Sequence, residues 1–496
     1  MSGWIKNIVE KIKELSSSVD KYKKDTVIQS LPSLASVNRA KKLLETQKYD
    51  EAEAILLKAL ELPQKDPLVY KYLGAVYEKT AKHELAVENY QISADLNPHD
   101  KIIWQRLGFS LISCKKYEQA EKSFENADKI QPANTDTFTG WGMALMKQEK
   151  FAQAREKFQQ AAKLNKYNFS AIFLCAVMEI KLEMYDVAET KLAFLANVAP
   201  NENNTFEYAR LKALKDDYEG AVHYAKKSLE FNSKMLPAYI ILGQVYAFMC
   251  DKENSLKYFA LAEEKGLSNS NLYLEWGKAL EKFGDFEAAI SKLRKASEED
   301  KEDIEVLSHL GLCLVSKKEF DEASPILEKV LGKEPENKVI KQAYGILKYE
   351  TDDIQGAISC FRSDDEDAMN CYYLAKCYEK QNNGTKVKDY YEAALRINNT
   401  NVNFYIDYIK YLISTNDFAD AQRKLRKVLK TDENNITLLN LLFYSSYILV
   451  KENICEYNVK EAVAIAEKIE NINTDLFEYP EQKAELKQIL QSMKEN

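Results

Sequence analysis

The stretch "YKYLGAVYEKTAKHELAVENYQISADLNP", residues 70–98, contains two helical patterns separated by a short polar break near residues 82–84. Its large apolar residues recur at three- and four-residue spacing, which marks one face of a helix. They are Tyr70, Leu73, Tyr77, Tyr90 and Leu96. Asn97-Pro98 ends the second pattern, because proline does not continue a helix. The stretch therefore predicts an antiparallel pair of helices.

Small residues repeat between residues 40 and 421 with a period of 34 residues, apart from one step of 33 and one of 30. One series is Ala52, Ala86, Ala120, Ala154, Ala188, Ala221, Ser255, Ala289, Ala323, Ala357, Val387 and Ala421. A second series, twelve residues earlier, is Ala40, Gly74, Gly108, Gly142, Ala176, Ala209, Gly243, Gly277, Gly311, Gly345, Ala375 and Ile409. A bulky group where two helices cross would overpack the contact by about 1–3 kcal/mol. We therefore expect repeated helix pairs that cross at these residues.

With this pattern the chain resembles the tetratricopeptide repeat family. The unit at 70–98 supplies the family's residues Tyr70, Leu73, Gly74, Tyr77, Ala86, Tyr90, Ser93 and Pro98. The next unit supplies Trp104, Leu107, Gly108, Leu111, Ala120, Phe124, Ala127 and Pro132, and the unit that ends at Pro335 supplies Leu307, Leu310, Gly311, Leu314, Ala323, Leu327 and Val330. The resemblance implies an all-α fold, a right-handed α-solenoid superhelix of about 12–13 helix pairs. It also implies that the first helix of each pair lines the concave face.

The organisation that follows has four parts. We expect an N-terminal amphipathic helix at 1–18, a connector at 19–33, the repeat array at 34–478 and a C-terminal capping helix at 479–496. The array has an irregular step near 363–368, where "SDDED" either caps a helix or forms a hinge. Its last repeat, 436–470, is looser. The 41-residue step from Ala421 to Ala462 predicts an extended loop around 451–458 there.

The N-terminal segment carries one apolar stripe, formed by Trp4, Ile5, Ile8, Val9, Ile12 and Leu15. Such a helix can lie on a membrane surface. Glu10 and Glu14 offset most of its lysines, so attraction to anionic lipid would be weak, about 1 kcal/mol per net charge. Packing on the first repeats or on a partner helix would bury the stripe equally well. No transmembrane span or signal peptide is evident, which predicts a cytoplasmic protein with membrane association as the alternative.

The chain shows no catalytic, cofactor-binding or metal-binding motif. Its net charge of −8 and the lack of a dominant basic patch disfavour nucleic acid as a partner. Eight cysteines without a CxxC pair are typical of free thiols in a reducing compartment. His309, at a groove-facing position, is the one residue that suggests an enzyme. A chaperone-type carboxylate clamp, known in the family, is not supported, because only Arg106 fits its pattern.

The groove-facing positions turn apolar in the middle repeats. The residues expected to form a partner groove are Gly140, Met143, Met146, Phe173, Val177, Ile180, Ile240 and Phe248. Gly140 stands where a side chain is usual, which predicts a shallow pocket in the groove floor. The alternative is that these residues pack against neighbouring first helices. The resemblance favours a non-enzymatic scaffold or adaptor that binds partner proteins or peptides on its concave surface. The alternatives are a membrane-peripheral assembly factor docked by residues 1–18 and, third, an enzyme with a groove site.

Overall fold

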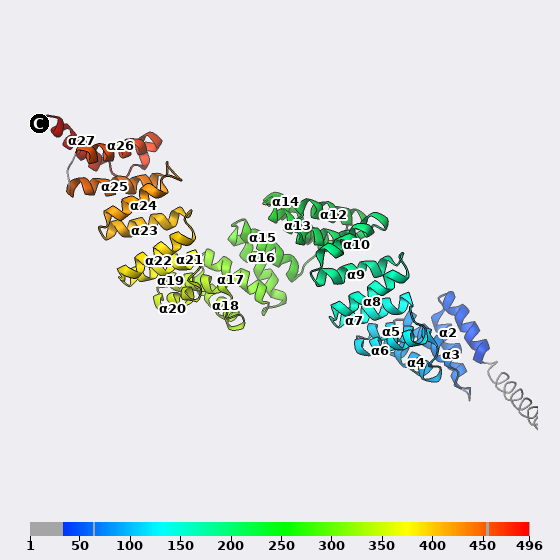
Figure 1. Ribbon diagram of the computed structural model, residues 1–496. Coiled ribbons are helices and arrows are strands. Elements are labelled where there is room, and N and C mark those ends of the chain that lie inside the picture. Colours follow the sequence, from blue (N-terminus) through cyan, green and yellow to red (C-terminus); the bar gives the residue numbers. More distant parts are fainter. Residues whose placement is uncertain (1–32, 63–64, 453–455, 496) are drawn as a thin grey trace, which may run out of the picture. The chain divides into compact units, whose positions relative to one another are not determined.

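The computed structural model describes residues 33–62, 65–452 and 456–495, and within these ranges the regular structure is helical, without strands (Figure 1). The helices follow one another in antiparallel pairs, as the period of 34 residues predicts. Within each of the two units described below, each pair packs against the next pair along the chain. The fold is therefore the predicted α-solenoid. It divides into two compact units, with the boundary between Leu267 and Ser268.

The first unit begins its described part with a helix at residues 33–45. Its further helices are α2 (Tyr49–Leu60), α3 (Pro67–Lys79), α4 (His83–Leu96), α5 (Lys101–Ser113), α6 (Tyr117–Ile130), α7 (Thr135–Lys147), α8 (Phe151–Leu164), α9 (Phe169–Lys181), α10 (Tyr185–Val198), α11 (Glu202–Leu214), α12 (Tyr218–Phe231), α13 (Leu236–Phe248) and α14 (Lys252–Glu264). The odd-numbered helices from α3 onward are the first helices of their pairs.

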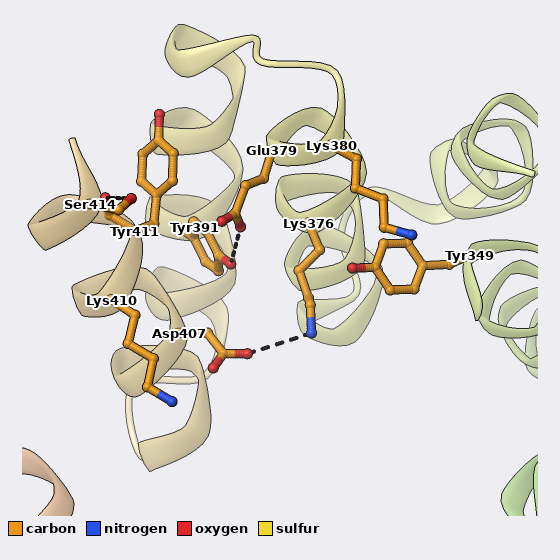
Figure 2. Close-up of a pocket in the computed structure, with 9 residues that line it drawn as sticks. All are labelled: Tyr349, Lys376, Glu379, Lys380, Tyr391, Asp407, Lys410, Tyr411 and Ser414. Atoms are coloured by element: carbon orange, nitrogen blue, oxygen red, sulfur yellow. Dashed lines mark hydrogen bonds and ion pairs between the residues drawn. The ribbon is translucent and has the colours of Figure 1, made fainter. Parts of the chain in front are cut away.

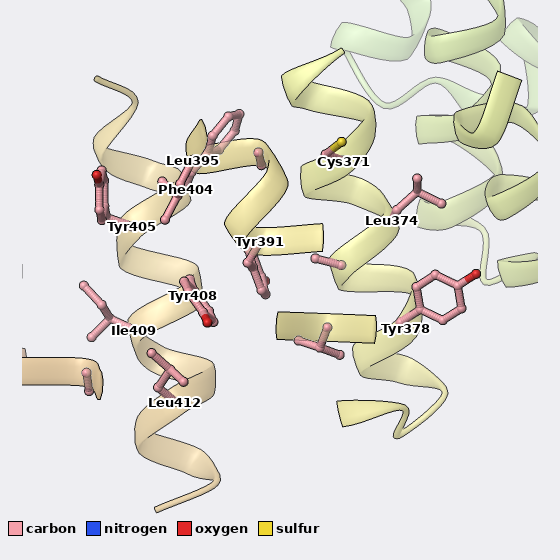
Figure 3. Packing of buried hydrophobic residues seen from close by; sticks show 14 of the residues in the cluster. Cys371, Leu374, Tyr378, Tyr391, Leu395, Phe404, Tyr405, Tyr408, Ile409 and Leu412 are labelled. Carbon is pink, nitrogen blue, oxygen red and sulfur yellow. The ribbon is translucent and has the colours of Figure 1, made fainter. Parts of the chain in front are cut away.

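The second unit continues the alternation. Its elements are α15 (Ser270–Lys282), α16 (Phe286–Glu299), α17 (Ile304–Ser316), α18 (Phe320–Lys333), α19 (Lys338–Glu350), α20 (Ile354–Phe361), η1 (Arg362–Asp364), α21 (Ala368–Lys380), α22 (Gly384–Ile397), α23 (Val402–Ser414), α24 (Phe418–Val428), α25 (Ile436–Glu452), α26 (Glu456–Asn473), η2 (Thr474–Leu476) and α27 (Pro480–Glu495). One extensive core lies where α21, α22 and α23 meet. Figure 3 shows Leu374, Tyr391, Tyr408 and Leu412 within that core.

Most first helices begin at short polar side chains; α13, which follows Met235, is an exception. An Asp or Asn directly before the helix accepts a hydrogen bond from a backbone N–H of the first turn, which satisfies a donor that the helix itself cannot. The residues that do so are Asp66, Asp100, Asn134, Asn168, Asn201, Asn269, Asp303, Asn337, Asp367 and Asn401. These caps recur with the repeat period and so help to set where each pair starts.

Helices within a pair cross at the small residues of the second series. A Cβ atom added at Gly108 would lie 2.7 Å from the ring of Phe124, and one added at Gly277 would lie 2.6 Å from Leu293. Both partners stand sixteen residues later, on the second helix of the same pair. The predicted reason for the small residues is therefore confirmed: a large side chain from the second helix fills the space.

First helices of successive pairs also approach one another. In the first unit α5 contacts α7, and α11 contacts α13; in the second unit α17 contacts α19, and α23 contacts α25. The corresponding second helices approach less closely. The first helices therefore lie on the inner side of each unit, which is where the resemblance places the concave face.

At the irregular step, the second helix of the pair is cut short. Helix α20 spans 8 residues and passes into the short 3-10 helix η1. The Asp367 carboxylate then accepts hydrogen bonds from the backbone N–H groups of Met369 and Asn370, both at 2.9 Å. Of the two interpretations of "SDDED", the structure supports the helix cap.

The last pair absorbs its extra length in helix rather than in a loop. Helices α25 and α26 span 17 and 18 residues and leave only 453–455 between them. The expectation of an extended loop at 451–458 is therefore wrong, because the apolar run before it continues the helix. Helix α27 follows, and its Leu486 is buried against the core of this last pair.

Candidate partner-binding surfaces

The expected groove residues lie on three first helices of the first unit, but they do not form one open surface. Ile180 on α9 and Ile240 on α13 are buried, each with 5% of its surface exposed. Phe248, at the end of α13, is 56% exposed and stacks on Tyr218, with ring centroids 5.6 Å apart. Packing against neighbours therefore accounts for Ile180 and Ile240, as the alternative interpretation held.

The shallow pocket expected at Gly140 is absent. A Cβ atom at this position would lie 2.4 Å from the ring of Phe124 and 2.9 Å from that of Phe109. Both aromatic residues come from the preceding pair, where their rings meet edge to face at 5.1 Å. The missing side chain of Gly140 makes room for these rings, so the hollow is filled from within the fold.

The other residues that were expected to line the groove, on α7 and α9, are half-buried. Two half-buried apolar residues of the preceding first helix, α5, extend their row. We call this set the apolar strip: Phe109 and Ile112 on α5, Met143 and Met146 on α7, and Phe173 and Val177 on α9. Met143, Met146 and Val177 pack against the same buried cluster. Phe109 and Ile112 occupy in their repeat the positions that Met143 and Met146 occupy in the next, and comparing these positions would have found them.

The second unit contains a pocket of about 480 Å³ that the sequence analysis missed (Figure 2). We call it the tyrosine pocket. It is lined by Tyr349, Lys376, Glu379, Lys380, Tyr391, Asp407, Lys410, Tyr411 and Ser414. These side chains come from the first helices α19, α21 and α23, with Tyr391 reaching in from α22. The sequence did contain a signal for this pocket. Lys376 and Lys410 occupy the same position in two successive repeats, and Tyr349 stands in the repeat before them.

Most charges around the tyrosine pocket are already satisfied. The Lys376 ammonium lies 3.6 Å from the Asp407 carboxylate, which also accepts a hydrogen bond from the Tyr372 hydroxyl. Lys380 pairs with Asp352 at 2.9 Å and lies over the Tyr349 ring, 4.5 Å from its centroid. Glu379 accepts a hydrogen bond from the Tyr391 hydroxyl at 3.5 Å.

His309 is paired with a carboxylate, but the nearest thiol on its own helix is not activated. Its Nδ1 atom lies 2.6 Å from the carboxylate of Glu281, on the preceding first helix. The nearest thiol along its own helix, Cys313, is buried, and burial together with the Glu281 charge raises the pKa of that thiol to about 12. A thiol with so high a pKa stays protonated near neutral pH and is a poor nucleophile.

Three further expectations from the sequence concern Arg106, the N-terminal apolar stripe, and membrane-spanning helices or metal sites. Arg106 pairs with Glu78 at 3.0 Å, so its charge is used within the fold. The stripe of Trp4, Ile5, Ile8, Val9, Ile12 and Leu15 lies outside the described residues and stays a prediction from the sequence. Across the described ranges no helix is long and apolar enough for a bilayer span, and no group of three metal-ligating side chains is assembled.

Comparison with protein-family models finds the tetratricopeptide repeat in two places, residues 102–134 and 280–347. The BBSome complex member BBS4 from Bos taurus is 20% identical over 293 residues, which cover 58% of this chain and 55% of that protein. The chain thus spans only about half the length of this relative.

Solved structures with a similar arrangement include a tetratricopeptide repeat protein from Parabacteroides merdae. It is 15% identical, has a TM-score of 0.43, and the match covers 49% of this chain and 98% of that one. In the APC/C hetero-tetramer Cut9–Hcn1, the matching chain is 14% identical with a TM-score of 0.43, and the match covers 82% of this chain and 95% of that one.

Proposed function

Because the chain belongs to the tetratricopeptide repeat family, we propose that it is a protein-interaction scaffold without catalytic activity, which holds a partner segment on the first helices of its first unit. The observation that carries this proposal is the apolar strip. Six half-buried apolar side chains on three successive first helices leave apolar surface in contact with water. Covering it would be favourable by about 25 cal/mol for each Å² removed from water.

The strip also indicates the chemistry of the segment. Methionine side chains adapt to differently shaped partners, and Met143 and Met146 form the middle of the strip. Lys147 and Lys181, at the ends of α7 and α9, are exposed beside it. An amphipathic helix with apolar residues at three- and four-residue spacing and acidic residues at its flank would complement both features.

The name of the relative supports an assembly role. BBS4 is described as a member of a complex, and it is 20% identical to this chain over 293 residues. We propose that this chain likewise works within a multi-subunit assembly, in which the partner segment belongs to another subunit.

Replacing Met143 or Phe173 by glutamate is expected to abolish partner capture. Each change places a charge on the strip, and burying an unpaired carboxylate under a partner is strongly unfavourable. Partners can be identified by cross-linking in cells and quantitative mass spectrometry, with wild type and both variants compared. A strip-dependent partner should fall by about tenfold or more in both variants.

The matched control is Phe248→Glu, because Phe248 is an exposed aromatic residue of the same unit that lies outside the strip. Helicity measured by circular dichroism should be the same for all variants. If every cross-linked partner survives both Met143→Glu and Phe173→Glu, the strip is not the binding surface.

A further inference from the structure

We propose that the tyrosine pocket of the second unit receives a basic side chain, arginine or lysine, from a protein partner. The inference shares with the proposed function only the idea that the chain binds proteins. It concerns a different unit, different residues and a different chemistry from the apolar strip.

The first observation is an unpaired carboxylate inside the pocket. Glu379 lines the pocket with an exposed side chain, and its carboxylate accepts a hydrogen bond from the Tyr391 hydroxyl. Among the described residues, no lysine or arginine lies within ion-pair distance of it, although Lys376 and Lys380 stand on the same helix. Those two lysines are instead held by Asp407 and Asp352. A carboxylate in a pocket without a paired cation can accept a charge-assisted hydrogen bond from a cation that enters from outside.

The electrostatic environment of Glu379 and Tyr391 also favours a cation in the pocket. Partial desolvation raises the pKa of Glu379 above its ordinary value, although the charge of Lys376 and the hydrogen bond from Tyr391 lower it, and the charge of Asp407 adds a smaller rise. Burial likewise raises the pKa of Tyr391, with further increases from the charges of Glu379 and Asp407. The charge of Lys376 therefore does not fully offset the desolvation of the Glu379 carboxylate, and a further positive charge beside it would stabilise its ionised form.

The walls of the pocket suit a cation as well. Tyr349, Tyr391 and Tyr411 line it, and cations are attracted to the faces of aromatic rings by about 0.5–2 kcal/mol. The protein itself already uses one of these rings in this way, since Lys380 lies over Tyr349. Arginine has the further advantage that its planar fork can donate to Glu379 while it stacks on a tyrosine. The net charge of −8 also favours association with a basic partner.

An acidic side chain is the competing occupant, because three lysines line the pocket. Lys376 and Lys380 are engaged in ion pairs, so an incoming carboxylate would have to break these pairs or share them. Lys410 is exposed, and Figure 2 shows its ammonium below Asp407, on the far side of that carboxylate from Glu379. Binding of a basic side chain and binding of an acidic side chain should respond in opposite ways to the same substitutions.

The test uses the full chain labelled with fluorotyrosine, with ¹⁹F NMR as the readout. The probes are N-acetylarginine amide, its neutral analogue N-acetylcitrulline amide, and N-acetylglutamate amide. Tyr349→Phe and Tyr411→Phe variants assign the resonances of the pocket. We expect the arginine probe to shift both resonances, and the citrulline probe to bind about tenfold more weakly because it lacks the charge.

Glu379→Gln should weaken the arginine probe by about tenfold, while Lys376→Met should leave its binding unchanged or strengthen it. The matched control is Glu350→Gln, an exposed carboxylate next to Tyr349 outside the pocket lining. The proposal is overturned if none of the probes shifts the pocket resonances. It is also overturned if the glutamate probe shifts them and Glu379→Gln strengthens that binding. Met143→Glu should not affect this assay, so the proposals for the apolar strip and for the tyrosine pocket can be refuted independently.

Discussion

A Lys191→Met variant should lose about 3 kcal/mol of stability in the part of the first unit formed by α8, α9 and α10. Lys191 belongs to a buried ion-pair group centred on Glu179. The side chain of Glu179 is completely buried, at 0% exposure. Its carboxylate is held by Lys191, 2.8 Å from both oxygens, and by Arg155 at 3.1 Å. Removing Lys191 leaves a buried carboxylate with one cation instead of two.

The size of the effect follows from the asymmetry of buried ion pairs. An intact pair contributes little, because desolvation offsets most of the attraction, but removal of one partner leaves charge without compensation. Replacing both Glu179 and Lys191 by methionine removes this problem, since Arg155 is partly exposed and can turn to solvent. The double variant should therefore recover most of the stability that the single variant loses. Position 179 also accepts an apolar residue readily, because Leu111 and Leu145 stand there in the two preceding repeats.

Hydrogen exchange followed by mass spectrometry is the appropriate measurement, because repeats contact mainly their neighbours and unfold locally. Exchange in α8–α10 should accelerate in Lys191→Met and return towards the wild-type rate in Glu179→Met/Lys191→Met. Lys181→Met is the control, since Lys181 is an exposed lysine on α9 outside the group. A double variant less stable than Lys191→Met would show that the ion pairs are net stabilising and contradict the argument.

The fold could be predicted because its causes lie close together in the sequence. Gly108 and Phe124 belong to one pair, sixteen residues apart, and their contact recurs with the repeat. Each repeat therefore gives the same information again, and the period alone identifies the helices. The short helix α20 was visible as a step of 30 instead of 34 residues.

The candidate surfaces could be predicted only in part, because they depend on which neighbour covers a side chain. The position of Ile180 within its helix indicates the inner face, but not that the surrounding helices bury it. Gly140 suggested a hollow, whereas Phe109 and Phe124 of the preceding pair fill it. The tyrosine pocket combines side chains from three successive repeats, and no single repeat shows its character.

The buried ion-pair group around Glu179 could also be predicted only in part. Glu179 could be recognised as unusual, because it occupies a position where the two preceding repeats have leucine. Its partners could not, since Arg155 lies 24 residues before it and Lys191 lies 12 residues after it. Neither spacing places two residues side by side on one helix, so the group exists only through the packing of α8, α9 and α10.

A Phe124→Ala variant should lose about 3–5 kcal/mol of stability, the largest effect expected for a single apolar residue of the strip region. The Phe124 side chain is fully buried and fills the space beside two glycines, Gly108 in its own pair and Gly140 in the next. Its truncation leaves a cavity at the junction of two pairs. Phe248→Ala, at an aromatic residue 56% exposed, should cost much less, within about 1 kcal/mol.

Gly140→Ala tests the same contact from the other side. In the wild-type background its Cβ would lie 2.4 Å from the Phe124 ring, and the overpacking of about 1–3 kcal/mol outweighs the gain in helix propensity of about 1 kcal/mol. In the Phe124→Ala background that ring is gone, and the Phe109 ring, 2.9 Å from the added methyl group, can shift into the cavity. The methyl group then fills part of the remaining space, and the propensity gain remains. Gly140→Ala should then stabilise the protein. Hydrogen exchange of α5, α6 and α7 in the four proteins of this cycle gives the coupling. Additive effects would mean that Phe124 does not occupy the space beside Gly140, and the groove floor would be open there after all.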